Sequence, residues 1–251
     1  MEEAVISVAD LRKSYKKVRA VAGVSLEVRG GEAYGLLGPN GSGKSTTLHA
    51  LVGIVRPSGG AASICGFDSR SLKARGLLGF VPDDLGMPET LSGGEFLDFV
   101  RSLYGVRDLS RTELLCRVLG LEDALGRLIE DYSHGMKKKL RVVAALLHKP
   151  RALVLDEPFG GLDPEATINL KRLISSEKAK GTAVFVATHD LLAAEHYCDR
   201  IGILSDGVLV AEGTTDQLFE RFGSDSLEEV FLKASGLLDR SREVETYLQH
   251  L

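Results

Sequence analysis

The feature that most restricts the fold of this chain is a glycine-rich segment, residues 38–45, with the pattern G-x-x-x-x-G-K-[ST]. It follows a short apolar run at 33–37 that predicts a buried strand, and it precedes a segment at 45–53 whose apolar residues have helical spacing. A strand, a glycine loop and a helix in this order form a phosphate-binding loop, because glycines let successive backbone N–H groups turn towards a phosphate at the positive end of the helix. The sequence therefore predicts an α/β fold that binds a nucleotide.

Residues of this loop have separate uses in phosphate chemistry. Lys44 is expected to reach the β and γ phosphates, and Ser45 to place its hydroxyl on Mg²⁺. Thr46 is expected to support a phosphate contact or simply to begin the helix. The residues that we expect to bind the nucleotide here are Gly38, Pro39, Asn40, Gly41, Ser42, Gly43, Lys44, Ser45 and Thr46.

A second motif ends another apolar run, where Asp156 and Glu157 follow Leu-Val-Leu at 153–155. Acids at the carboxyl end of a parallel strand lie at the edge of the sheet where α/β folds bind their ligands. Asp156 is expected to hold Mg²⁺ directly or through water, and Glu157 to orient and polarise an attacking water as general base. Without the phosphate loop, the two acids could equally be ordinary exposed residues at the end of a strand.

The remaining patterns predict how the chain is organised. Apolar runs at 77–81, 182–187 and 201–204, with a helical pattern at 164–180, predict a mainly parallel sheet. Runs at 5–8 and 21–28 predict a small N-terminal antiparallel sheet, and helical spacing throughout 84–150 predicts an inserted helical subdomain. Further helices are expected at 215–222, 227–234 and 243–248. We therefore predict an α/β fold with a P-loop NTPase core over 1–213, into which the helical subdomain of about 84–150 is inserted, and a short helical extension over 214–251.

Composition narrows the partners and the compartment. Lys plus Arg number 31 against 35 for Asp plus Glu, a formal net charge of −4, so no nucleic-acid partner is expected. The three cysteines, Cys65, Cys116 and Cys198, form no close pair, which argues against a disulfide scaffold and suits a reducing cytoplasm. No run approaches the roughly 18 apolar residues that a membrane span requires.

These motifs, in this order, resemble the ATP-binding subunit of ABC transporters over nearly the whole chain. Residues 161–163, Gly-Leu-Asp, resemble the D-loop at the dimer contact of that family, and His189 resembles its switch histidine, which senses the γ-phosphate. Tyr15 stands where the family places an aromatic ring that stacks on adenine. The resemblance implies ATP and Mg²⁺ as cofactors and ATP hydrolysis with Lys44, Glu157 and His189 as catalytic residues.

Two segments compete for the signature motif of the family, usually written LSGGQ. Residues 91–95, Leu-Ser-Gly-Gly-Glu, match by letters but begin 65 residues before Asp156. Residues 132–136, Tyr-Ser-His-Gly-Met, match poorly, yet Ser133 lies 23 residues before Asp156 and opens the helix that leads into that strand. We choose the second segment and expect Ser133 and Gly135 to contact the γ-phosphate held by the opposite protomer of a head-to-tail dimer.

The first segment then has a local explanation, because Ser92 and Glu95 form the sequence pattern of a capping box for a helix at 96–104. Its two glycines would be incidental. Three lysines, Lys137, Lys138 and Lys139, follow the chosen segment. They predict either a solvated helix face or, because positive charge opposes the dipole at a helix start, a bound phosphate.

The chain departs from the family at Asp83, where glutamine or glutamate is usual. The shorter side chain is expected to reach Mg²⁺ through a water, and the segment 84–90 is expected to face a transmembrane partner. The resemblance implies a cytoplasmic subunit, peripheral at the inner face of the cell membrane, that forms a homodimer or heterodimer of ATPase subunits and drives a separate permease. The signature segment and the tail at 226–232 look more like export-type subunits than importers.

Two other functions remain open from the residues. The chain could be a non-transport ABC ATPase that regulates or assembles a soluble complex. A P-loop GTPase or a small-molecule kinase is a weaker alternative, because the sequence contains no Asn-Lys-x-Asp guanine motif.

Overall fold

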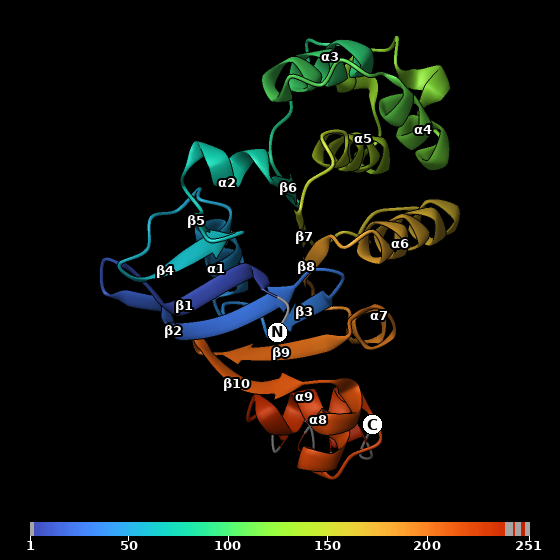
Figure 1. The fold of residues 1–251 in the computed structure, drawn as a ribbon. Helices are drawn as coiled ribbons and strands as arrows, with labels where there is room; N and C mark the ends of the chain where they lie inside the picture. Colours follow the sequence, from blue (N-terminus) through green and yellow to red (C-terminus); the bar gives the residue numbers. More distant parts are fainter. Residues whose placement is uncertain (1–2, 239–242, 244–246, 249–251) are drawn as a thin grey trace.

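The structure, a computed structural model, describes residues 3–238, 243, 247 and 248. Its centre is a six-stranded sheet with the order β10-β9-β3-β8-β7-β6 (Figure 1). Every neighbouring pair in this sheet is parallel except β9 and β10. The strands are β3 (Ala33–Leu37), β6 (Leu78–Val81), β7 (Ala152–Asp156), β8 (Ala183–Ala187), β9 (Arg200–Ser205) and β10 (Val208–Gly213).

The central strands are buried on both faces, which explains their continuous apolar sequences. Every residue of β3 and of β8 is buried. One face, which includes Val154 and Phe185, packs against the antiparallel sheet and Leu48 of helix α1 (Lys44–Leu51). The other face, which includes Leu155, packs with residues of α5 (His134–Leu146) and α6 (Pro164–Ala179). The mainly parallel sheet and its helices confirm the predicted fold class.

The antiparallel sheet has four strands rather than the two that the sequence predicts, in the order β2-β1-β4-β5. Strands β1 (Ala4–Tyr15) and β2 (Val18–Arg29) are longer than their apolar runs. Strands β4 (Gly59–Ile64) and β5 (Phe67–Asp68) escape prediction because β4 is rich in glycine and alanine, which have low strand propensity. Pairing with β1 nevertheless holds β4 in the sheet.

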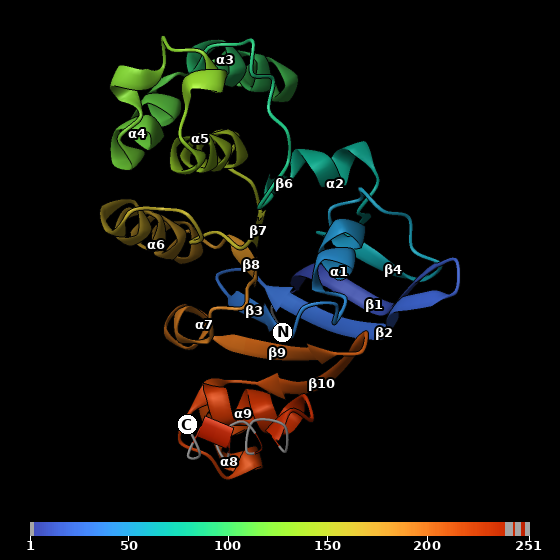
Figure 2. The ribbon, with the colours of Figure 1, turned by 180° about the vertical axis from the view of Figure 1, so that it is seen from behind.

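Between β6 and β7 the chain forms helices α3 (Gly93–Tyr104), α4 (Ser110–Leu119) and α5, joined by two short 3₁₀ turns, Glu122–Ala124 and Ile129–Asp131. These helices gather at one end of the molecule (Figures 1 and 2). Helices α8 (Thr215–Phe222) and α9 (Leu227–Ala234) cover β9 and β10 at the other end, with the bounds that the sequence predicts. The helix expected at 243–248 falls largely outside the described residues.

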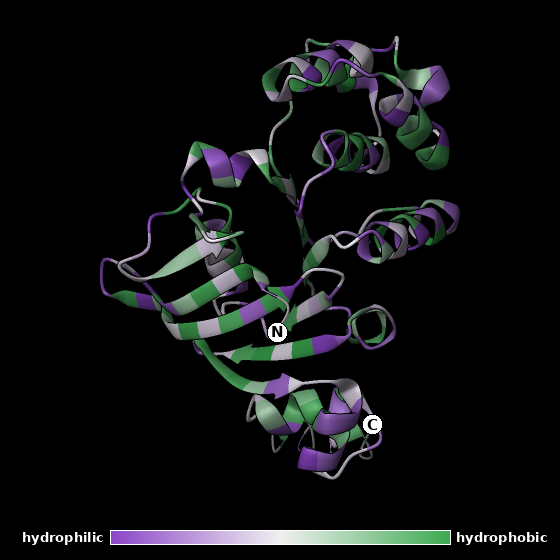
Figure 3. Cartoon of the chain, viewed as in Figure 1, coloured by the Kyte–Doolittle hydropathy of each residue, from purple (hydrophilic) through white to green (hydrophobic). Residues whose placement is uncertain are grey.

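Two shorter helices complete the core, α2 (Leu72–Gly76) before β6 and α7 (Leu191–Tyr197) after β8. Hydrophobic residues are concentrated along the strands, whereas the helices at the two ends carry mixed faces (Figure 3). Among the described residues, no helix is long and apolar enough to cross a membrane.

Candidate nucleotide-binding site

The glycine-rich loop connects β3 to α1, as its sequence predicts. Two of its glycines are required by the structure. A Cβ at Gly38 would lie 2.4 Å from the carbonyl oxygen of Leu204, and Gly43 has a φ of +103° with the carbonyl oxygen of Ala20 2.4 Å from the place of a Cβ. Gly43 is also the N-cap of α1 and brings no side chain to it, so the first N–H groups of the helix stay available to an anion.

An open cavity of about 550 Å³ lies over this loop and contains most of the predicted site. It is lined by Tyr15, Ala20, Asn40, Gly41, Gly43, Lys44, Ser45, Thr46, Asp83, Asp156, Glu157 and His189. Ala20 was not predicted, because only the fold places the start of β2 beside the loop. Gly38, Pro39 and Ser42 support the loop from outside the lining, whereas Ser133 and Gly135 belong to the helical end of the molecule and do not line the cavity.

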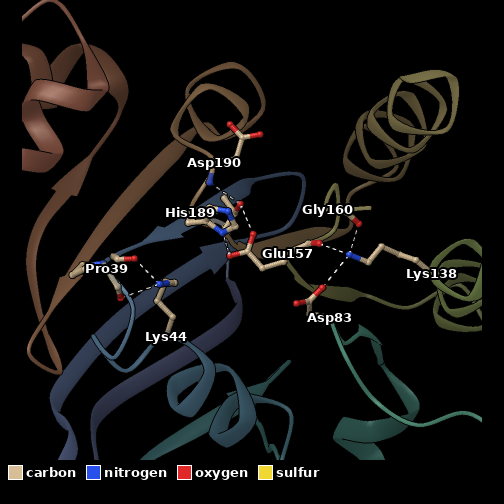
Figure 4. A network of polar contacts seen from close by, with 10 residues as sticks. Pro39, Lys44, Asp83, Lys138, Glu157, Gly160, His189 and Asp190 are labelled. Carbon is tan, nitrogen blue, oxygen red and sulfur yellow. Dashed lines mark hydrogen bonds and ion pairs between the residues drawn. The ribbon is translucent and has the colours of Figure 1, made fainter. Parts of the chain in front are cut away.

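The Lys44 ammonium group lies inside its own loop, where Nζ donates to the carbonyl oxygens of Gly38 and Pro39 (Figure 4). Burial lowers the pKa of Lys44, and the carboxylates of Glu157 and Asp156 oppose that shift. A phosphate would offer this cation charged acceptors in place of neutral carbonyl oxygens, and hydrogen bonds between charged partners are the stronger kind. The geometry is therefore suited to binding a nucleoside triphosphate.

Both carboxylate oxygens of Glu157 are held by the end of the neighbouring strand. Oε1 lies 2.7 Å from Nδ1 of His189, and Oε2 accepts a hydrogen bond of 2.9 Å from Oγ1 of Thr188 (Figure 4). Thr188 is buried at 2% exposure, and its Oγ1 also accepts from the backbone N–H of Asp190 at 3.0 Å. The carboxylate is thus fixed in orientation before any ligand arrives.

The sequence patterns make His189 a candidate site residue and do not single out Thr188. The signal was present, because a hydroxyl at the carboxyl end of a parallel strand points to the same edge as acids on the next strand. This signal requires the knowledge that β8 lies beside β7, and the structure supplies it, because Asp156 pairs with Ala187.

The surroundings of Asp156 disfavour its negative charge, as expected for a carboxylate that binds a cation. Burial raises the pKa of its carboxyl group, and the carboxylates of Asp83 and Glu157 raise it further, while His49 and Lys44 oppose the shift. A divalent cation would relieve this repulsion. Within the described part of the chain no group of three or more His, Cys, Asp or Glu residues could hold a metal ion. The carboxylates of Asp156 and Asp83 line one cavity with Ser45, a donor set that suits Mg²⁺, which is usually bound by one or two carboxylates together with substrate phosphates and waters.

The lysine run differs from both interpretations of the sequence. The Lys138 side chain is fully buried, and its Nζ donates to Oδ1 of Asp83 at 3.1 Å and to the backbone oxygens of Glu157 at 2.7 Å and Gly160 at 2.8 Å. It is therefore neither solvated nor directed at a phosphate. Lys137 pairs with Glu89 at 2.6 Å, and Lys139 lies 3.4 Å from Asp163, so these two lysines also bind protein carboxylates.

The structure gives both signature candidates a helix start. Ser92 caps α3 in a capping box with Glu95, as predicted. Ser133 caps α5, where its Oγ accepts from the backbone N–H of Met136 at 3.2 Å. The expectation that the glycines of the first segment are incidental is wrong for Gly93, because a Cβ there would lie 2.1 Å from the hydroxyl oxygen of Tyr132.

A phosphate loop between a parallel strand and a helix, with acids at the end of a neighbouring strand, is typical of a P-loop nucleoside triphosphatase. The family model described as ABC transporter matches residues 21–160, more than half of the chain. The chain belongs to the ABC transporter family. It is an ATP-binding and ATP-hydrolysing subunit of such a transporter.

Curated relatives cover most of the chain. The linearmycin resistance ATP-binding protein LnrL of Bacillus subtilis (strain 168) is 34% identical over 238 residues, 93% of this chain and 76% of its own. The daunorubicin/doxorubicin resistance ATP-binding protein DrrA of Streptomyces peucetius is 37% identical over 227 residues, 88% of this chain and 69% of its own. A solved structure described as an ATP-binding subunit of an ABC transporter has a TM-score of 0.87 and 34% identity, and the match covers 92% of this chain and 99% of that one.

Proposed function

We propose that this chain pairs with a second ATPase subunit around two Mg-ATP, and that the pair drives a separate transmembrane export permease from the inner face of the cell membrane. One observation carries the proposal. The cavity gathers Lys44, Asp156, Glu157 and His189, whereas Ser133 and Gly135 lie outside it, at the start of another helix. Each chain would thus supply half of two composite sites.

In this proposal the cavity residues divide the work of hydrolysis. Lys44 binds the β and γ phosphates, and Tyr15, whose side chain is exposed and lines the cavity, stacks on the base. Ser45, Asp156 and Asp83 would hold Mg²⁺, Asp83 through a water, and bound Mg²⁺ neutralises charge on the phosphates.

Glu157 accepts the proton of the attacking water, because it is the cavity carboxylate whose two oxygens are already oriented by neighbouring side chains. His189 holds Glu157 through Nδ1 and offers Nε2 to the γ-phosphate, and its side chain is 76% exposed and so accessible to a ligand. The start of α5 in the partner closes the site, since a helix N-terminus capped by Ser133 favours an anion.

A groove between the core and the helical end suits the permease contact. It has a volume of about 330 Å³ and is lined by Val52, Ile54, Arg75, Leu78, Phe80, Val100, Leu103, Tyr104, Ala144 and Ala145. Leu103 is 67% exposed and Ile54 56%, and a gathered set of exposed apolar side chains marks an interaction surface. An amphipathic helix on the inner side of the permease fits this groove.

The export direction is supported by the names of the relatives. LnrL and DrrA are named as resistance proteins, and another relative, 36% identical over 234 residues, is named the Nod factor export ATP-binding protein I of Burkholderia orbicola (strain AU 1054). Antibiotic resistance by a transporter subunit is most simply explained by export.

The test uses Glu157→Gln, which we expect to bind ATP without hydrolysing it and so to trap the dimer in detergent extracts of the natural host. We expect a multi-span membrane protein to co-purify in near-equal amount, identified by mass spectrometry. Leu103→Glu in the groove should lose the membrane protein but keep the Mg-ATP dimer. Leu114→Glu is the matched control, because Leu114 is exposed on α4 and lies outside the groove. Recovery of soluble partners alone would favour the ABC ATPase that assembles a soluble complex.

A further inference from the structure

We propose that Lys138 is a positioning residue that makes α5, the Asp83 segment and the loop at 157–160 move as one body. The inference rests on the proposed function, because it takes Asp83 to face the nucleotide and Ser133 to face the γ-phosphate of the partner. Lys138 would then link the two faces of one chain, the face that senses its own nucleotide and the face that completes the opposite site.

Lys138 carries a full positive charge in a buried position. The Lys138 side chain has 0% exposure, and lysine is almost never fully buried unless it is paired. An ammonium group has three N–H donors and no acceptor, and Lys138 has three protein acceptors, at 2.7, 2.8 and 3.1 Å. All three donors are therefore used, and the cation is held in one place.

The three acceptors of Lys138 belong to three different segments. Asp83 follows β6, Glu157 follows β7, and Gly160 lies in the loop that leads to α6 (Figure 4). Lys138 reaches them from α5, five residues after Ser133, which is a distance of about 7.5 Å along the helix axis. A rigid helix carries any displacement of these three segments to Ser133.

Two further residues of α5, His134 and Arg141, contact the loop before α6 and the Asp83 segment. A Cβ on Gly161 would lie 2.6 Å from Cδ2 of His134, so the first residue of α5 packs directly on this loop. Arg141, also on α5, donates to the backbone oxygens of Asp83 at 3.2 Å and Leu85 at 2.6 Å. Arg141 thus holds the backbone of the Asp83 segment, and Lys138 adds its carboxylate, which lines the nucleotide cavity.

Residue 83 is the counter-charge of Lys138. A carboxylate here forms an ion pair with Lys138, whereas a neutral glutamine would leave a buried cation without a counter-charge. The departure of this chain from the family at Asp83 is therefore matched by a buried lysine. Two residues that act as a unit should be strongly non-additive when both are replaced.

The experiment compares Lys138→Met, Asp83→Asn and the double variant with a matched control, Lys137→Met. Lys137 is the preceding residue of the same helix, and its partner Glu89 is largely exposed. Each variant is made alone, for kcat and KM, and with Glu157→Gln, for Mg-ATP-dependent dimerisation by light scattering. Glu157→Gln keeps the backbone oxygen that Lys138 binds. A fluorescent ATP analogue reports the nucleotide affinity of the monomer.

We expect Lys138→Met to lower kcat and to raise the ATP concentration for half-dimerisation by about tenfold, with monomer affinity changed by less than about threefold. Lys137→Met should match the parent. The double variant should lose less kcat than the two single losses combined, although Asp83 also has its own contact with Mg²⁺ in the proposed site. Lys138→Gln, which keeps a donor and most of the length, should fall between Met and Lys. It also replaces Lys138→Met if that variant does not fold.

The inference is overturned if Lys138→Met lowers only the melting temperature while kcat and dimerisation stay at the parental values, because the lysine is then merely structural. It is also overturned if the Asp83 and Lys138 effects on kcat add. If Glu157→Gln itself gives no dimer with Mg-ATP, the composite site of the proposed function fails. The double-variant comparison on kcat then still decides the role of Lys138.

Discussion

Replacing Thr188 with valine tests whether Glu157 depends on its orientation. Valine keeps the shape of the side chain but removes Oγ1, which donates 2.9 Å to Oε2 of Glu157. Because Thr188 is 2% exposed, water cannot occupy the place of its hydroxyl, and Oε2 is left with the unpositioned water of the open cavity as its donor. A hydrogen bond to a charged group contributes about 1.5–3 kcal/mol, and about 1.4 kcal/mol corresponds to a tenfold change in rate. We therefore expect kcat to fall by about 10–100-fold.

The assay is steady-state phosphate release with Mg-ATP, together with an equilibrium measurement of ATP affinity. Thr188 does not line the nucleotide cavity, so the affinity should stay within about twofold of the wild type. Thr188→Ser, which keeps the hydroxyl, is the control and should retain most of kcat. A valine variant with near-normal kcat, or a serine variant as slow as valine, would refute the orienting role of this hydrogen bond.

Two further predictions concern stability. Gly93→Ala should lower the free energy of unfolding by about 1–3 kcal/mol, because the added Cβ would lie 2.1 Å from the Tyr132 hydroxyl oxygen. Urea unfolding should show the loss in this variant and not in Gly126→Ala, where no atom lies within 4 Å of the added group. Burial lowers the pKa of His148 to about 4, although its hydrogen bond to the Leu78 oxygen opposes this, whereas an unfolded histidine titrates near ~6.5. Between these two pKa values the unfolded state binds a proton that the folded state does not bind. Lowering the pH from 7 to 5 should therefore lower the free energy of unfolding by about 2 kcal/mol through this residue. An equal loss in His148→Gln would contradict the prediction.

Local patterns were sufficient wherever the physics is local. The phosphate loop needs only a strand, glycines and a helix start in sequence, and the capping box of Ser92 and Glu95 spans four residues. The ends of α8 and α9 follow from their capping residues, Thr214 and Ser226, and from the apolar spacing after them. For the same reason, the acids at the end of β7 could be assigned to the ligand edge of the sheet before the structure was known.

Contacts between distant segments could not be obtained in this way. Lys138 lies 55 residues from Asp83 in the chain, and a lysine in a run of three has the local pattern of an exposed helix face. Thr188 and Glu157 are 31 residues apart and meet only because β8 lies beside β7. The sequence pattern makes Gly93 look incidental, because the Tyr132 hydroxyl that leaves no room for a Cβ at residue 93 comes from a distant part of the chain.

The sequence by itself determined the family, the nucleotide loop and the chemical types of the residues at the site, because each depends on short motifs and on their order along the chain. Only the tertiary structure decided which groups share a hydrogen bond and which charge is buried. Strand order and helix packing set those contacts, and the free energy of burying a charge depends on the partners that the fold brings to it.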